Sequence, residues 1–436
     1  MRGLNFLGRL LDGAAVEWKP LGEVSRLITK GTTPQKFIDS GINFVKTESL
    51  ENGRINPQKF MFVSQETHEK ELKRSILEAN DILFAIAGSI GKCTVVEESI
   101  LPANTNQALA IIRLDETVNV RFVFYCMQTL AMQEYIAKYN KASAQPNLNL
   151  QQIGNFPIPL PCPDNPDRSL AIQAEIVRIL DTFTALTAEL TAELTAELTA
   201  RQKQYEYYRD RLLTFEEGEA EWKTLGEVAE KIYSGGTPKT GIAEYWVNGS
   251  IPWMSSGEVN LETVYETEKF ITEAGLKNSS AKFVPKNSLV IALAGQGKTR
   301  GKVARLRIDL TTNQSLASLT FDESKINPDY VYHFLKTQYE NLRQISSGGD
   351  TRGGLNLQMI SNYKIPIPPL EKQARIVGIL DKFDTLTNSI REGLPREIAL
   401  RQKQYEYYRD LLFSFPLSLT QQRDNPDQTS SLKKED

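Results

Sequence analysis

RQKQYEYYRD spans residues 201–210, and the same ten residues return at 401–410. An identical decapeptide at this distance indicates an internal duplication. Other matched pairs keep the same order along the chain: EWKPLGEV from Glu17 with EWKTLGEV from Glu221, GTTP from Gly31 with GGTP from Gly235, Asn106-Gln107 with Asn313-Gln314, LNLQ from Leu148 and from Leu355, PIPLP from Pro157 with KIPIP from Lys364, and ILDTF from Ile179 with ILDKF from Ile379. The chain is therefore predicted to hold two similar units.

Each unit is predicted to have a globular part, rich in short strand-like runs and turns, followed by a helical segment. The expected domains are 1–161 (first globular domain with a short N-terminal segment), 162–214 (helical spacer), 215–369 (second globular domain), 370–415 (second helical spacer) and 416–436 (a polar, disordered tail). Arg9-Leu10-Leu11 resembles Arg211-Leu212-Leu213, so the N-terminus begins where a repeat ends, as in a circular arrangement. The fold class expected is α/β (α+β).

The helical segments show a coiled-coil spacing of apolar residues, for example in steps of four and three from Ile172 to Leu190. An unbroken helix over 169–213 would span roughly 65 Å at ~1.5 Å per residue. Gly393-Leu394-Pro395 is predicted to kink the second helix. A pseudo-two-fold axis between the duplicated units would make the two helices antiparallel, and DNA has a matching two-fold.

The first helix contains the run TAELTAELTAEL from Thr187 to Leu198. One interpretation is a slippage-prone DNA tract that encodes a neutral stretch of helix. The other is a ruler that sets the distance between the globular parts. We favour the ruler, because the run lies inside the rod that separates them.

Bulk composition excludes several classes of protein. Three cysteines stand far apart and only two histidines occur in 436 residues, which argues against a zinc site or a disulfide framework. Free thiols fit a reducing cytoplasm. No apolar run approaches the ~18 residues of a membrane span. We expect a cytoplasmic protein that makes no use of a membrane.

Local charge points to nucleic acid, although the net charge is only −3. Residues 274–308 hold no acid and eight basic residues: Lys277, Lys282, Lys286, Lys298, Arg300, Lys302, Arg305 and Arg307. Such a stretch suits phosphate contacts. The alternative is a solvated face balanced by acids elsewhere in the fold.

Further candidates lie near the glycine turns and in two polar stretches that precede the helices. The candidate DNA-binding residues are Lys30, Thr32, Lys36, Lys92, Lys141, Ser143, Gln145, Asn147, Lys239, Lys298, Thr299, Arg300, Lys302 and Arg352. Amide and guanidinium groups suit base edges, but any single one of these residues is more often a turn or phosphate contact.

Two other patterns have structural interpretations. Gly297-Lys298-Thr299 resembles the end of a P-loop, but the pattern needs glycine where Ala292 stands, so we expect a turn shared with Ala87–Lys92. Trp246 and Trp253 are expected in a core.

The tyrosines of the duplicated decapeptide cannot all face one helix seam, which makes them candidates for a partner surface. They are Tyr205, Tyr207, Tyr208, Tyr405, Tyr407 and Tyr408.

To about residue 415, this layout resembles the specificity subunits of type I restriction–modification enzymes. GGTP with the later Ile251–Trp253, the Asn-Gln pairs, and the LNL and PIP motifs resemble recurring elements of that family. The TAEL run resembles a subgroup whose spacer varies with repeat number. The resemblance implies two domains that each recognise half of a split, asymmetric double-stranded DNA target. It also implies a bacterial complex with two modification subunits, which use S-adenosylmethionine, and two restriction subunits.

We find no methyltransferase motif, nuclease carboxylate cluster or Ser/His/Asp arrangement in the sequence, so the chain is predicted to be non-catalytic and to need no cofactor of its own. A coiled-coil scaffold that binds only proteins is the alternative. A restriction enzyme fused into one chain would need the missing motifs.

Overall fold

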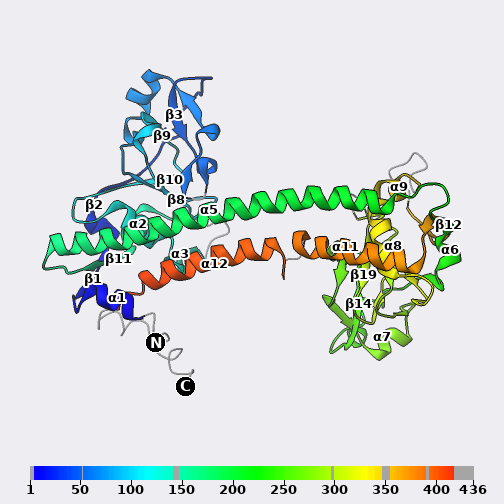
Figure 1. Ribbon diagram of the computed structural model, residues 1–436. Helices are drawn as coiled ribbons and strands as arrows, with labels where there is room; N and C mark the ends of the chain where they lie inside the picture. Colours follow the sequence, from blue (N-terminus) through cyan, green and yellow to red (C-terminus); the bar gives the residue numbers. More distant parts are fainter. Residues whose placement is uncertain are drawn as a thin grey trace. The chain divides into compact units, whose positions relative to one another are not determined.

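The structure is a computed structural model that describes residues 4–51, 53–140, 147–295, 299–345, 354–388 and 392–416 (Figure 1). The predicted disordered tail thus lies almost wholly outside the described residues. The chain forms two compact units: unit 1 is Met1–Glu193 with Ile398–Asp436, and unit 2 is Leu194–Glu397. Each unit joins one globular part to pieces of both helical segments. The predicted domain boundaries divide the chain into consecutive segments, whereas each compact unit contains segments that are far apart in the sequence. The predicted boundaries therefore stay a prediction.

Unit 1 contains a central antiparallel sheet in the order β2-β10-β7-β8, from Ser25–Lys30, Leu109–Leu114, Ile82–Ala85 and Cys93–Val95. A smaller sheet has the order β6-β3-β9, from Met61–Val63, Ile42–Val45 and Ala103–Thr105, with β3 and β9 parallel. Two antiparallel pairs complete the strands: β1 (Val16–Pro20) with β11 (Pro157–Pro161), and β4 (Leu50–Glu51) with β5 (Arg54–Ile55).

Unit 2 repeats this plan. Its main sheet has the order β13-β21-β18-β19-β15, from Lys231–Ser234, Leu316–Thr320, Leu289–Ala292, Val303–Leu306 and Thr263–Val264. Its second sheet has the order β16-β14-β20-β17, from Lys269–Ile271, Ile251–Met254, Leu310–Thr312 and Phe283–Val284, with β14 and β20 parallel. β12 (Glu221–Thr224) pairs with β22 (Lys364–Ile367). The duplication and the mixed α/β class are both confirmed.

Short helices surround these sheets. In unit 1 they are α1 (Leu4–Leu11), α2 (Val120–Met127), α3 (Leu130–Asn140) and α4 (Leu150–Gly154). In unit 2 they are α6 (Leu225–Val228), α7 (Glu273–Lys277), α8 (Pro328–Thr337), α9 (Tyr339–Ile345) and α10 (Leu357–Ser361). α2 and α8 occupy matching places, and asparagines, Asn119 and Asn327, cap both. A capping side chain satisfies N–H groups that the first turn leaves unpaired.

The first helical segment is one helix, α5 (Pro166–Leu213), which begins at a proline and contains the whole TAEL run. Proline suits the first position of a helix because its missing N–H has no partner there. The second segment is two helices, α11 (Leu370–Asn388) and α12 (Leu394–Leu412), rather than the single kinked helix predicted. Gly393 disfavours helix and Pro395 fits only a first turn, so a new helix begins at Leu394.

Both cores combine strands with pieces of two helical segments. In unit 1, Ile176 of α5 shares a core with Leu412 and Phe413 from the end of α12 and with Leu7 of α1. Described residues from near both ends of the chain therefore share one core, as the circular arrangement predicted. In unit 2, Ile376 of α11 shares a core with Tyr205 and Leu213 of α5. Trp253 is buried against Trp246, with ring centroids 5.1 Å apart, so the expectation of core packing holds for this pair.

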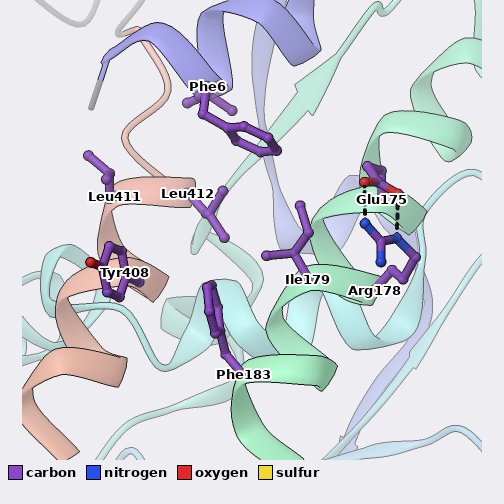
Figure 2. Close-up of a pocket in the computed structure, with 9 residues that line it drawn as sticks. Phe6, Glu175, Arg178, Ile179, Phe183, Tyr408, Leu411 and Leu412 are labelled. Atoms are coloured by element: carbon purple, nitrogen blue, oxygen red, sulfur yellow. Dashed lines mark hydrogen bonds and ion pairs between the residues drawn. The ribbon is translucent and has the colours of Figure 1, made fainter. Parts of the chain in front are cut away.

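The duplicated decapeptide makes the same ring contact in both units. Tyr408 stacks on Phe183 at 5.6 Å, and Tyr208 stacks on Phe383 at 5.7 Å. In unit 1, Leu412 and Ile179 line the same pocket as Tyr408 and Phe183, so α5 and α12 run in opposite directions. Figure 2 shows this apolar pocket of about 370 Å³, with Phe6 of α1 on its third side. The coiled-coil description of these helices stays a prediction.

Among the described residues, every helix is too short or too polar to cross a membrane. The three cysteines are free and buried. Within the described ranges, no three His, Cys, Asp or Glu side chains come together as a metal site.

Candidate nucleic-acid interface

The strand order of unit 1 brings separate loops to one end of its main sheet. Neighbouring strands are antiparallel, so the end of β2, the start of β10, the end of β7 and the start of β8 lie together. The loops at this end hold Gly31–Pro34, Asn106-Gln107 and Ile86–Lys92. The N–H of Leu148 donates to the Ile86 carbonyl at 3.0 Å, which adds the chain around Asn147. We call these segments the loop end of unit 1.

Unit 2 has an equivalent loop end. It contains Gly235–Lys239 after β13, Asn313-Gln314 before β21, and the described parts of the β18–β19 hairpin at 293–295 and 299–302. The N–H of Leu355 donates to the Leu293 carbonyl at 3.0 Å, in parallel with Leu148 in unit 1. Both loop ends thus gather the motifs whose duplication is visible in the sequence.

A hydrogen bond across the loops explains why these motifs recur. The Thr237 hydroxyl bonds to Gln314 Oε1 at 2.6 Å, and Thr33 bonds to Gln107 in the same way. Gly31 and Gly235 make room for this contact. A Cβ on Gly31 would lie 2.2 Å from the Thr105 carbonyl oxygen, and one on Gly235 would lie 2.0 Å from that of Thr312.

Sequence reasoning did not place Thr33, Gln107, Thr237 or Gln314 among the candidate site residues. The signal was present, because the GTTP and GGTP motifs and both Asn-Gln pairs stand out as duplicated. What the sequence could not show is that each threonine reaches the glutamine of a loop more than seventy residues away.

The candidate residues of unit 1 lie at its loop end wherever they are described. Lys30, Thr32, Lys36, Lys92 and Asn147 are exposed there or in the loop that follows β2. In unit 2, Lys239 is exposed, and Thr299, Arg300 and Lys302 are half-buried at the base of the hairpin loop. Lys141, Ser143, Gln145, Lys298 and Arg352 lie outside the described residues.

Gly297 and Lys298 of the Gly-Lys-Thr motif lie outside the described residues, so the turn predicted there stays a prediction, but the described residues around it and around Ala87–Lys92 have the same arrangement. Both segments close an antiparallel hairpin: Gly91 N–H donates to the Ala85 carbonyl at 3.1 Å, and Gly301 N–H to the Ala292 carbonyl at 2.9 Å. A P-loop would instead join a strand to a helix.

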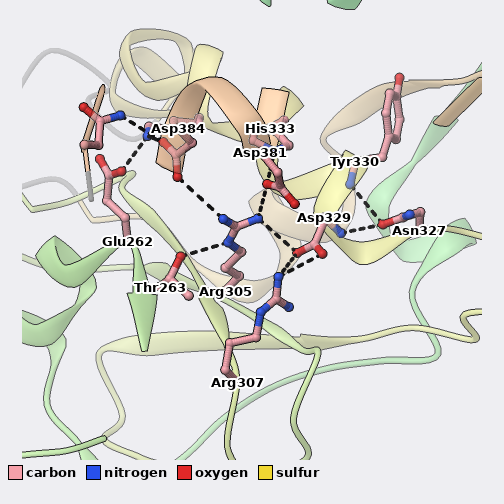
Figure 3. A network of polar contacts seen from close by, with 12 residues as sticks. Glu262, Thr263, Arg305, Arg307, Asn327, Asp329, Tyr330, His333, Asp381 and Asp384 are labelled. Carbon is pink, nitrogen blue, oxygen red and sulfur yellow. Dashed lines mark hydrogen bonds and ion pairs between the residues drawn. The ribbon is translucent and has the colours of Figure 1, made fainter. Parts of the chain in front are cut away.

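Part of the predicted basic patch is wrong. Arg305 is only 7% exposed and forms ion pairs with Asp329 and Asp381, while Arg307 pairs with Asp329 at 2.9 Å (Figure 3). For these two arginines the alternative of balance by acids within the fold is correct. Lys302 donates to Asn260 at 2.7 Å but stays half-buried at the loop end.

The structure also reduces the set of tyrosines that can form the predicted partner surface. Tyr205 is 6% exposed and belongs to the core of unit 2, and Tyr405 accepts a hydrogen bond from the Thr184 hydroxyl at 3.1 Å. Burial of Tyr205 contradicts its naming as a partner contact, whereas Tyr405 is half-buried and stays a predicted partner contact. Tyr207 and Tyr407 are 59% and 63% exposed and stay predicted partner contacts. Tyr208 and Tyr408 divide their surface between ring stacking and solvent.

Comparison with known proteins identifies the family. The model of the type I restriction modification DNA specificity domain matches residues 15–200 and 218–400. The type I restriction enzyme EcoR124I/EcoR124II specificity subunit of Escherichia coli is 41% identical over 424 residues, 95% of this chain and 98% of that one. The EcoprrI specificity subunit of Escherichia coli is 34% identical over 90% of this chain and 93% of that one.

Solved structures agree on the fold. A chain from a structure that describes complex assembly and conformational transition of the type I R-M system has a TM-score of 0.62 at 18% identity, covering 92% of this chain and 98% of that one. The HsdS subunit of Thermoanaerobacter tengcongensis has a TM-score of 0.51 at 16% identity, covering 91% and 95%. The chain belongs to the family of type I restriction–modification specificity subunits.

Membership in this family decides between the function classes left open by the sequence. The relatives are named specificity subunits, the non-catalytic DNA-recognition components of these systems. A DNA specificity subunit is therefore supported over a scaffold that binds only proteins.

Proposed function

We propose that the two loop ends contact the two parts of a split DNA target. The observation that carries this proposal is convergence: basic and amide side chains from four separate segments meet at one end of each main sheet. Their chemistry fits DNA, since lysine and arginine neutralise phosphates and amides bond to adenine edges.

The two parts of the target differ in sequence under this proposal. The duplicated scaffold fixes similar loops, but the hairpin loops differ: Ala87–Lys92 is AGSIGK, whereas the longer 294–302 is AGQGKTRGK. Different side chains on the same scaffold would select different bases. The result is an asymmetric, bipartite target.

Charge removal at one loop end tests the proposal. Arg300→Ala with Lys302→Ala should weaken DNA binding by the purified chain and lower the salt slope of log K by up to ~2, or about 0.9 for each phosphate that is no longer neutralised. Lys286→Ala with Lys325→Ala is the matched control. Both control lysines are exposed and flank the opposite end of the same sheet.

The two double variants remove the same charge from the chain. A general loss of electrostatic attraction would weaken both to the same degree. An unchanged salt slope in the Arg300/Lys302 variant, or an equal loss in the control, would contradict contact at the loop end.

We further propose that two modification subunits dock on the identical segments 201–210 and 401–410, through Tyr207 and Tyr407, and that two restriction subunits join through them. Identical surfaces can hold identical subunits, and exposed tyrosines suit interface anchors. S-adenosylmethionine would be used by the modification subunits. We expect the purified chain alone neither to methylate nor to cleave DNA.

The TAEL run is proposed to set the gap between the two parts of the target, as in the subgroup it resembles. Support comes from its place inside α5, which is helical without a break from Pro166 to Leu213. A helix converts residue number into length and rotation at about 1.5 Å and 100° per residue.

A further inference from the structure

A dense cluster of charges in unit 2 joins the β18–β19 hairpin to two helices. Arg305, on β19, lies 2.6 Å from Asp381 and 3.5 Å from Asp384, both on α11, and 3.5 Å from Asp329 on α8. Its Nε donates to Thr263 at 2.8 Å, and its guanidinium lies 4.8 Å from the centre of the Tyr332 ring. Figure 3 shows the arginine at the centre of this cluster.

Other charges surround this arginine. Arg307 pairs with Asp329 at 2.9 Å, and Lys336 lies between Glu262 and Asp384 at 2.5 and 3.4 Å. His333 Nε2 lies 2.9 Å from Asp381. Arg305 is the cation that contacts all three aspartates, so its removal leaves Asp381 and Asp384 with fewer positive partners.

In unit 1, the cation that pairs with the corresponding helix aspartate comes from a different element. Strand register places Val95 opposite Ile82 and Arg305 opposite Leu289, so Val95 occupies the position of Arg305. The helix aspartate is kept as Asp181, but its cation is Arg121 of α2, at 2.6 Å. Counting from the caps Asn119 and Asn327, Arg121 corresponds to Asp329.

This exchange of positions has a mechanical consequence. In unit 1 the ion pair between Arg121 and Asp181 joins α2 to α5, and it includes no residue of the β7–β8 hairpin. In unit 2 the hairpin itself carries the arginine, three residues after Lys302 of the loop end. Buried charge pairs with several hydrogen bonds fix geometry because breaking them leaves an unpaired charge.

We propose that Arg305 is a positioning residue that fixes the β18–β19 hairpin on α8 and α11, so that DNA recognition by unit 2 depends on a contact that unit 1 lacks. The proposal rests on the proposed function, because it takes the hairpin loop as a DNA contact. It adds that the second part of the target is recognised through a hairpin held by the helix.

The test moves the arginine to the arrangement of unit 1. Arg305→Val with Asp329→Arg keeps one cation beside Asp381 but releases the hairpin; because it also removes the partner of Arg307, Asp329→Asn alone is measured beside it, and only the loss beyond that of Asp329→Asn is assigned to Arg305. Arg121→Met is the control, because it breaks the matching ion pair in unit 1 without touching a hairpin. Arg305→Lys serves as a second variant, since it keeps the charge but cannot reproduce the forked geometry of a guanidinium.

Hydrogen exchange on the full chain measures positioning directly. We expect amides of β19 to exchange roughly tenfold faster in Arg305→Val with Asp329→Arg, and less so in Arg305→Lys, while β8 stays unchanged. Equal protection of β19 in the wild type and in both variants would overturn the proposal.

Methylated sites, mapped in a host that also carries the modification subunit, measure recognition. We expect the Arg305 variants to methylate more sites that carry a mismatch in one part of the target. That part should be the one whose binding is weakened by Arg300→Ala with Lys302→Ala. Arg121→Met should not increase methylation of mismatched sites. Faster exchange without this loss of fidelity would overturn the role in recognition. If the Arg300/Lys302 variant leaves DNA binding unchanged, the proposed function fails, whereas hydrogen exchange still decides whether Arg305 fixes the hairpin.

Discussion

The two units hold their helices with the same apolar contacts but with different charges. Gln173 and Gln373 accept from the backbone N–H groups of Asn119 and Asn327 at 2.8 and 2.9 Å, so the capped helix is fixed alike in both units. The aspartate of the duplicated ILD motif is also kept. Its cation comes from α2 in unit 1 and from β19 in unit 2.

This difference separates what the duplication preserves from what it leaves free. Ring stacking, capping and the glycine-dependent loop contact are the same in both units, because each depends on close packing that tolerates little change. Ion pairs can be rebuilt from another strand or helix as long as the charges balance. Within the loop ends proposed to contact DNA, the hairpin loops differ between the units in length and in sequence.

Deletion of one TAEL repeat is expected to have the largest effect, because it changes how both units work together. Deleting Thr195–Leu198 shortens α5 by about 6 Å and turns its distal part by about 40°. One base pair adds ~3.4 Å and roughly 35°. We expect methylation of the parent sites to be lost and sites with a gap shorter by one or two base pairs to replace them.

Mapping methylated sites for the deletion and the parent side by side checks this prediction. The bases in each part of the target should stay the same, since neither globular part is altered. An unchanged gap, or changed bases in either part, would show that the run is not a ruler.

Partner docking gives a direct test of equivalence between the duplicated segments. Tyr207→Ala and Tyr407→Ala should each weaken one of two binding sites by about 2 kcal/mol, or roughly thirtyfold. Titration of the modification subunit, followed by mass measurement of the complexes, should show one tight site in each single variant. Full assembly of the double variant would contradict docking on these tyrosines.

The glycines of the loop ends should be equally intolerant of a side chain. Gly31→Ala and Gly235→Ala each place a Cβ near 2 Å from a carbonyl oxygen, so we expect a loss of about 1–3 kcal/mol in the stability of the altered unit. Gly8→Ala is the control, because its Cβ would meet nothing within 4 Å. Thermal unfolding measures the effect, and a harmless Gly235→Ala would show that the loops can move apart.

The smallest of these effects is expected for the ion-pair cluster of unit 2, whose contribution to stability should decrease at acid pH. Burial alone would raise the pKa of Asp381, but hydrogen bonds from His333 and Arg305 outweigh it and lower the pKa from 3.8 to about 2. The lowered pKa contributes stability that is fully present above about pH 4 and is lost as the pH falls through about 2. Asp381→Asn should therefore cost more stability at pH 7 than at pH 2.

Chemical unfolding followed by tryptophan fluorescence suits this measurement, because Trp222, Trp246 and Trp253 all lie in unit 2. The same loss at both pH values would mean that Asp381 acts through packing alone.

Much of the fold could be predicted from the sequence because duplication and helix periodicity are local signals. RQKQYEYYRD, the ILD motifs and the TAEL run were sufficient for two units and a long helix. The helix break at Gly393 was placed correctly but predicted as a kink. Whether the helix kinks or ends there depends on whether the backbone hydrogen bonds continue past Pro395. The residue types alone do not decide this.

The site was harder to predict because it depends on strand order. Nothing in the sequence shows that β10 lies between β2 and β7, which is the arrangement that brings Gln107 to Thr33. Arg305 was counted with the exposed basic residues for the same reason. Alternation along β19 does not reveal that a charged side chain points toward α8 and α11, because its acidic partners lie on other elements.

The central claim is that each unit recognises its own part of the DNA target on a shared scaffold. Replacing residues 215–369 with residues 14–161, so that the chain carries the first globular part twice, tests it most directly. The account predicts that methylated sites, mapped with the modification subunit present, will carry the bases of the first part in both halves of the target. A target that keeps the bases of the second part would contradict the account.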